Sequence, residues 1–87
     1  MARLAIIGTG YVGLTTGACL AHLGHDVVCA DVDIEKVDRL ADGEVPIVEA
    51  GLSDLVAEGL SADRLRFTAD VAGSVADRQV VFLCVPT

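Results

Sequence analysis

The segment 5–13, with the sequence Ala-Ile-Ile-Gly-Thr-Gly-Tyr-Val-Gly, constrains the fold of this chain more than any other. It is typical of a short buried strand, followed by a glycine-rich turn and the start of a helix. Gly8 allows the tight turn, Gly10 lets a pyrophosphate group approach the backbone, and Gly13 lets the helix pack close to the strand. Because the first N–H groups of a helix have no partners within it, they can bind a diphosphate.

An acidic residue further along the chain strengthens this interpretation. A second apolar run ends at Asp31, close to the roughly 20-residue spacing at which dinucleotide-binding folds place the carboxylate that holds the adenosine ribose. The alternative is a solvated acidic residue at a strand end. A carboxylate there repels the extra phosphate of NADP, because like charges about 4 Å apart at an effective dielectric of about 20 repel by about 4 kcal/mol. We therefore predict an NAD site, with Tyr11 and Val12 shaping the pyrophosphate turn.

The hydrophobic pattern predicts the element order β-α-β-α-α-β-α-β over the 87 residues. The expected strands are 3–7, 27–30, 65–68 and 80–85, and the expected helices are 12–23, 34–41, 52–60 and 71–76. Asp33 and Asp70 are expected to cap the second and the fourth of these helices. With right-handed crossovers, these elements form a parallel sheet of strand order 3-2-1-4 with helices on both faces. The fold class is therefore α/β of the Rossmann type, and residues 1–87 make up about half of a dinucleotide-binding domain.

The same pattern predicts which side chains are buried. Gly17, in the middle of a helix, is expected to mark a close contact, because glycine there costs about 1 kcal/mol relative to alanine. The strand 80–85 is expected to form a bare apolar edge, so we interpret the chain as part of a larger protein or as one that pairs with another chain. The first helix is expected to pack closely on the sheet through Val12, Cys19, Leu20 and Leu23, together with the small Thr16, Gly17 and Ala18. In the later helices the positions expected to be buried are Ile34, Val37, Leu40, Leu52, Leu55, Val56 and Leu60.

Composition and charge exclude several classes of protein. The net charge of −7 argues against a nucleic-acid partner, and a hydrophobic content of 53% excludes a disordered chain. No apolar run approaches the roughly 18 residues of a membrane span, and 1–3 leaves no room for a signal peptide. Cys19, Cys29 and Cys84 lie in apolar segments without metal-ligand spacing, which indicates buried thiols in a reducing compartment. We expect a cytoplasmic protein with no metal, nucleic-acid or membrane partner.

The remaining candidate residues are interpreted more simply. Lys36 is near enough to Asp31 to reach the adenosine end of a cofactor, although a surface lysine is the plainer explanation. Thr87 follows the last strand, at the carboxyl edge where such folds bind ligands. His22 and His25 flank a glycine turn and are expected to be turn and surface residues, because no paired acid or cysteine is evident. No catalytic triad, metal cluster or carboxylate pair is visible, so we predict no catalytic residue in this chain.

A series of segments resembles the amino-terminal part of the UDP-glucose/GDP-mannose dehydrogenase family. The resemblance covers essentially the whole chain, and its most specific part is the stretch that matches Gly-Glu-x-Pro-Ile-x-Glu-Pro-Gly-Leu. This chain departs from that stretch at Val48 and Ala50, where the family often has an aromatic residue and a proline. The segments that carry the resemblance are 7–14, 17–21, 23–25, 31–33, 43–47, 49–52, 64–68 and 85–87.

The resemblance implies NAD as the cofactor, with Val12, Asp31, Lys36 and Thr87 at its binding positions. It also implies a parent enzyme that oxidises the C6 hydroxyl of a nucleotide sugar to a carboxylate, UDP-glucose to UDP-glucuronate, in two NAD-dependent steps. In that family a downstream cysteine forms the thiohemiacetal and thioester intermediates, and the cysteines of this chain do not occupy its motif. For the full-length protein we expect a nucleotide-sugar substrate and a homo-oligomer.

Two other classes share parts of this pattern. Regulatory nucleotide-binding modules of potassium transport have the glycine turn and the acidic strand end, but they lack the loop that runs from Pro46-Ile47 to Gly51-Leu52. Methyltransferases of a related fold normally lack the third glycine of the turn. The loop is therefore the discriminating feature, and it favours the dehydrogenase.

Overall fold

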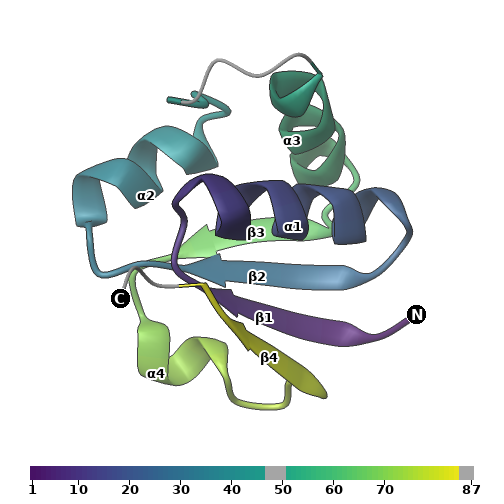
Figure 1. Ribbon diagram of the computed structural model, residues 1–87, viewed down its shortest axis with the longest axis vertical. Coiled ribbons are helices and arrows are strands. Elements are labelled where there is room, and N and C mark those ends of the chain that lie inside the picture. Colours follow the sequence, from purple (N-terminus) through teal and green to yellow (C-terminus); the bar gives the residue numbers. More distant parts are fainter. Residues whose placement is uncertain (47–50, 85–87) are drawn as a thin grey trace.

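The structure is a computed structural model that describes residues 1–46 and 51–84 (Figure 1). The described residues form the predicted sequence of elements, and their bounds differ from the prediction by a few residues at most. The strands are β1 (Arg3–Ile7), β2 (Asp26–Ala30), β3 (Leu65–Thr68) and β4 (Val80–Leu83). The helices are α1 (Tyr11–His22), α2 (Ile34–Ala41), α3 (Leu52–Ser61) and α4 (Val71–Ser74). Residue 85, the predicted end of the last strand, lies outside the described residues.

The four strands form one parallel sheet of order β3-β2-β1-β4, as predicted. In β1, one of the two inner strands, Ile6 pairs with Cys29 of β2 on one side and with Phe82 of β4 on the other. The parallel strands all end at the same edge of the sheet, which brings the turn after β1 close to the residue that follows β2. This is the Rossmann-type arrangement, in which ligands bind at the carboxyl edge of the sheet.

Helices cover the two faces of the sheet unequally. Figure 1 shows α1, α2 and α3 on one side of the sheet and the short α4 on the other. The contact of α1 with the sheet is close, because a Cβ at Gly17 would lie 2.6 Å from Cys29 Sγ. That confirms the predicted role of Gly17. A similar contact, which the pattern did not predict, occurs at Gly59, where a Cβ would lie 2.7 Å from Leu65 Cβ.

The predicted packing face of α1 is only partly correct. Val12 and Leu23 are 63% and 72% exposed, and Cys19 is exposed as well. Gly17 and Ala18 are buried as predicted, and the helix contacts the sheet mainly through small residues, together with Leu14. Leu20 is partly buried against the core. The buried residues of α1 are Gly13, Leu14, Gly17, Ala18 and Ala21.

The other two predicted faces are largely correct. In α2, Val37 and Leu40 are buried, but Ile34, in the first turn, is 64% exposed. In α3, all four predicted positions contribute to the core: Leu52 and Val56 are buried, and Leu55 and Leu60 pack against it. The core joins these side chains to Leu4, Ile6, Leu14, Val27 and Leu65 of the sheet and α1.

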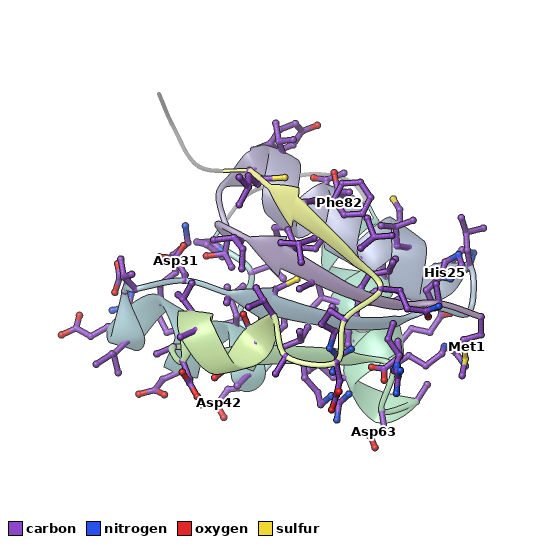
Figure 2. The ribbon with its side chains drawn as sticks, turned by 90° about the horizontal axis from the view of Figure 1, so that it is seen from below. Met1, His25, Asp31, Asp42, Asp63 and Phe82 are labelled. Atoms are coloured by element: carbon purple, nitrogen blue, oxygen red, sulfur yellow. The ribbon has the colours of Figure 1, made fainter. Side chains whose placement is uncertain are left out.

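The strand β4 forms the exposed apolar edge that the sequence predicts. Its side chains are 37–75% exposed, and Phe82 is visible on the outer strand in Figure 2. No helix among residues 1–46 and 51–84 is long and apolar enough to cross a membrane.

Candidate functional site

A cavity of about 640 Å³ lies at the carboxyl edge of the sheet. Its volume falls within the range of small-molecule binding sites. The turn after β1, the start of α1, the end of β2 and the first turn of α2 form most of its wall. The lining residues include 7–12, 30–32, Lys36, Val71 and Cys84.

The three glycines of the turn have different physical roles. Gly8 has a φ of 106°, which favours glycine, and its N–H donates to the carbonyl oxygen of Ala30 at 2.8 Å. A Cβ at Gly13 would collide with the carbonyl oxygen of Gly8, so both of these glycines are required by the turn itself. At Gly10, in contrast, no atom lies within 4 Å of a Cβ position. The fold therefore does not require Gly10, and its open space adjoins the cavity.

The amino end of α1 suits an anionic ligand. The helix is capped by Gly10, which has no side chain to accept from the first N–H groups, and its first turn contains no acidic residue. The 12 residues of α1 give a full helix dipole whose positive end lies at the cavity. A diphosphate bound there meets the first N–H groups of the helix, and no carboxylate of the helix's own first turn repels it.

Asp31 is held in place by three hydrogen bonds. Its Oδ2 accepts from the backbone N–H of Thr9 at 3.0 Å and from the Thr9 hydroxyl at 2.6 Å. Its Oδ1 accepts from the backbone N–H of Asp33 at 3.1 Å. Burial raises the pKa of Asp31, but these hydrogen bonds and the charge of Lys36 outweigh burial and hold the pKa below its ordinary value. Asp31 is therefore a carboxylate at neutral pH, as a ribose acceptor must be.

Thr9 was missed by the sequence analysis. It is fully buried, and its hydroxyl joins the glycine turn to the end of β2. The signal that could have found it is a hydroxyl residue between the first two glycines of the turn, with an aspartate at the end of the next strand.

The structure brings most of the predicted site residues together. Lys36 and Asp31 line the same cavity, as do the exposed Tyr11 and Val12. Asp33 is the helix cap that the sequence predicts, because its Oδ1 accepts from the backbone N–H of Lys36 at 3.1 Å. Thr87 and 47–50 of the discriminating loop lie outside the described residues.

The two histidines lie away from this site. Figure 2 shows His25 and Met1 at the opposite end of the sheet from Asp31. The Nδ1 of His25 accepts from the backbone N–H of Ala2 at 3.0 Å. His22 does have an acidic neighbour, which the sequence analysis did not find, because Glu58 of α3 lies 3.0 Å from its Nδ1. This pair is exposed and ties α1 to α3, so the interpretation as turn and surface residues stands.

The cysteines are free thiols, and only Cys29 is fully buried. Cys29 is buried, and burial, together with the neighbouring Cys84, raises its pKa to about 12. Such a thiol is not a nucleophile at neutral pH. Cys19 is exposed and Cys84 is only partly buried, which corrects the expectation that all three are buried. Within the described parts of the chain, no group of three or more His, Cys, Asp or Glu could hold a metal ion.

Residues 2–87 match the profile of the UDP-glucose/GDP-mannose dehydrogenase family, NAD binding domain. The chain belongs to this family. Among curated proteins, it is 51% identical to a UDP-glucose 6-dehydrogenase of Pseudomonas aeruginosa over 98% of the chain and 19% of that protein. It is 44% identical to a GDP-mannose 6-dehydrogenase of Azotobacter vinelandii over 98% of the chain and 20% of that protein. The chain thus spans about a fifth of these relatives.

Solved structures of family members have the same fold. A ternary complex of a GDP-mannose dehydrogenase from Pseudomonas aeruginosa has a TM-score of 0.93 and 42% identity, over 98% of this chain and 20% of that one. A UDP-glucose dehydrogenase from Pyrobaculum islandicum has the same TM-score and 39% identity, over the same shares. The family's NAD binding domain is therefore the part to which this chain corresponds, and its cofactor is NAD.

The residues of this family member fit the cofactor. The open space at Gly10 and the uncapped end of α1 suit a diphosphate, and the ionised Asp31 suits a ribose. Lys36, at the cavity wall, balances the charge of that carboxylate. The observations that support NAD thus come from three separate elements that meet at one cavity.

Proposed function

We propose that this chain holds NAD for a parent UDP-glucose 6-dehydrogenase and contributes none of the catalytic residues. The observation that carries this proposal is the meeting of the glycine turn, Asp31 and Lys36 at one cavity of about 640 Å³. In this proposal residues 1–87 are the amino-terminal part of the NAD-binding domain, and the substrate site and catalytic groups belong to other parts of the protein. The relatives named above are about five times as long as this chain, which agrees with that division.

Each residue of the site has a proposed role. Gly8 and Gly13 shape the turn, and Gly10 and the amino end of α1 accept the diphosphate. The side chains of Tyr11 and Val12 form the wall beside it, where they exclude water. Asp31 accepts from the adenosine ribose, and Lys36 faces the same end of the cofactor. These roles account for the described site residues, and Thr87 keeps its role as a prediction from the resemblance alone.

Bound NAD accepts a hydride, and this chain's residues bind and orient it. In the proposed reaction the parent enzyme oxidises UDP-glucose to UDP-glucuronate with two NAD. The preference for UDP-glucose over GDP-mannose rests on the higher identity to the UDP-glucose 6-dehydrogenase, 51% against 44%. We also propose that the parent protein is cytoplasmic and a homo-oligomer.

The test is to compare cofactor binding and turnover in the full-length protein and its Asp31→Asn variant. Titration calorimetry measures the affinities for NAD and NADP. We expect the wild-type protein to prefer NAD, and Asp31→Asn to reduce that preference at least tenfold, because the variant no longer repels the extra phosphate, a repulsion of about 4 kcal/mol. An unchanged ratio of the two affinities contradicts the ribose role of Asp31.

Turnover then decides the substrate. The formation of NADH is followed with UDP-glucose and, separately, with GDP-mannose. We expect two NADH for each UDP-glucose consumed and little reaction with GDP-mannose. A faster reaction with GDP-mannose contradicts the substrate but leaves the NAD site intact. Tight binding of NAD without turnover of any nucleotide sugar favours a regulatory nucleotide-binding module instead.

A further inference from the structure

Thr9 is a fully buried polar residue whose partner belongs to the proposed NAD site. Its side chain has no exposed surface, and its hydroxyl donates to Asp31 Oδ2 at 2.6 Å. Its backbone N–H donates to the same oxygen at 3.0 Å. Thr9 belongs to the turn after β1, whereas Asp31 follows β2, so the two hydrogen bonds connect the diphosphate part of the site to its ribose part.

These hydrogen bonds leave little acceptor capacity on Asp31. A carboxylate has about four acceptor positions, two on each oxygen. Thr9 fills both positions of Oδ2, and the N–H of Asp33 fills one of the two on Oδ1. Among the hydrogen bonds of the described residues, one position, on Oδ1, is therefore left for a ligand.

We propose that Thr9 is a positioning residue, which holds Oδ2 of Asp31 so that Oδ1 is the oxygen offered to a ribose hydroxyl of NAD. This inference rests on the proposed NAD site. Thr9 does not itself need to touch the cofactor, since it acts through Asp31. The carboxylate then has its final orientation before NAD arrives, and no rotamer freedom of Asp31 is lost on binding.

The same hydroxyl favours the ionised form of Asp31. Burial raises the pKa of Asp31, and the Thr9 hydroxyl is the first of the groups that lower it. The others are the backbone N–H groups of Asp33 and Thr9 and the charge of Lys36. Tyr11, Lys36 and Cys84 are the titratable side chains that line the cavity with Asp31. Removal of the hydroxyl raises the pKa of Asp31, so acid should abolish NAD binding at a higher pH than in the wild-type protein.

The experiment compares Thr9→Val, which removes the hydroxyl at nearly constant shape, with Thr9→Ser, which keeps it. Titration calorimetry on the full-length protein gives the NAD affinity over a range of pH. Thr9→Val should weaken the affinity for NAD about tenfold at neutral pH, whereas the affinity of Thr9→Ser should stay within about twofold of the wild-type value. In the ligand-free protein, the carboxyl carbon resonance of Asp31 should titrate at higher pH in Thr9→Val than in Thr9→Ser.

The control is Thr15→Val, the same substitution at a threonine of α1 whose hydroxyl is buried and has no partner among the described residues. It should leave both the NAD affinity and the titration of Asp31 unchanged. If Thr9→Val destabilises the fold too far, Thr9→Ala removes the same hydroxyl and is measured in the same way.

The outcomes separate this inference from the proposed function. If Asp31→Asn weakens NAD binding while Thr9→Val equals Thr9→Ser in both affinity and titration, Thr9 is not a positioning residue and the NAD site stands. If the wild-type protein does not bind NAD, both proposals fail. If Thr9→Val shifts the titration of Asp31 but leaves the NAD affinity unchanged, the positioning role is overturned. Loss of affinity with a shifted titration, restored by serine, supports it.

Discussion

At the scale of single residues, the hydrogen bonds of one carboxylate decide how the site works. Asp31 is partly buried, yet it keeps its charge because Thr9, Asp33 and Lys36 stabilise the ionised form more than burial destabilises it. The lowered pKa of Asp31 is therefore a property of its partners. The same groups also contribute to the stability of the fold.

This has a consequence for stability against pH. The pKa of Asp31 is lower in the folded protein than in the unfolded chain, where it is about 3.9. Its contribution to the free energy of unfolding is therefore fully present above the unfolded pKa and is lost as the pH falls through the folded pKa. We expect Asp31→Asn to be less stable than the wild-type protein at neutral pH and the difference to shrink in acid. Urea unfolding at neutral and at acidic pH measures the difference in the free energy of unfolding. A difference independent of pH contradicts the prediction.

At the scale of elements, α1 is positioned by its small residues. The helix lies so close to the sheet that a Cβ at Gly17 would overlap Cys29 Sγ, whereas Val12 and Cys19 of the same helix are exposed. Its amino end therefore reaches the cavity with an orientation fixed by the close contacts at Gly13 and Gly17. The close packing of α1 on the sheet thus also determines where the positive end of the helix lies.

Two glycine substitutions distinguish packing from ligand space in this element. Gly17→Ala should destabilise the protein by about 1–3 kcal/mol, because the overlap with Cys29 outweighs the better helix propensity of alanine. Gly10→Ala should fold as well as the wild-type protein, because its φ of −70° suits alanine and no atom lies within 4 Å. Thermal unfolding measures both effects.

Gly10→Ala should still weaken NAD binding, since its methyl group occupies the space proposed for the diphosphate. Equal NAD affinity in Gly10→Ala and wild type contradicts that role.

At the scale of the whole molecule, the sheet is covered unequally and has one exposed apolar edge. Three helices pack on one face and the short α4 on the other, and the strand β4 leaves Val80, Val81, Phe82 and Leu83 exposed (Figure 1). An exposed apolar edge strand offers unpaired backbone groups and apolar side chains to other chains. The exposed edge therefore gives this segment, when it is isolated, a surface through which it can associate with other chains.

We expect residues 1–87, produced as an isolated segment, to associate through β4. A charged side chain on the edge should oppose this association, so Val81→Lys should shift the segment toward monomer in sedimentation velocity. The matched control is Val32→Lys, at an equally apolar but more exposed site outside β4. Association that is unaffected by Val81→Lys, or reduced equally by both variants, contradicts a role of the edge.

The sequence alone predicts the order of the elements, the strand order of the sheet, the helix caps at Asp33 and Asp70, and the meeting of the glycine turn with Asp31. These follow from short-range patterns: apolar periodicity, capping residues and glycines with defined backbone roles. The carboxyl edge of a parallel sheet then brings the strand ends together whatever the details of packing.

Only the tertiary structure decides which face of α1 is buried and which donors hold Asp31. The apolar pattern of α1 places Val12 and Cys19 on the packing face, but the close approach to the sheet leaves both exposed and buries Leu14 with the small residues. The hydrogen bond from Thr9 to Asp31 joins residues 22 positions apart, and the contact of His22 with Glu58 joins residues 36 positions apart. Such pairs depend on the register of the strands and the distance between layers, and no local pattern in the chain encodes either of them.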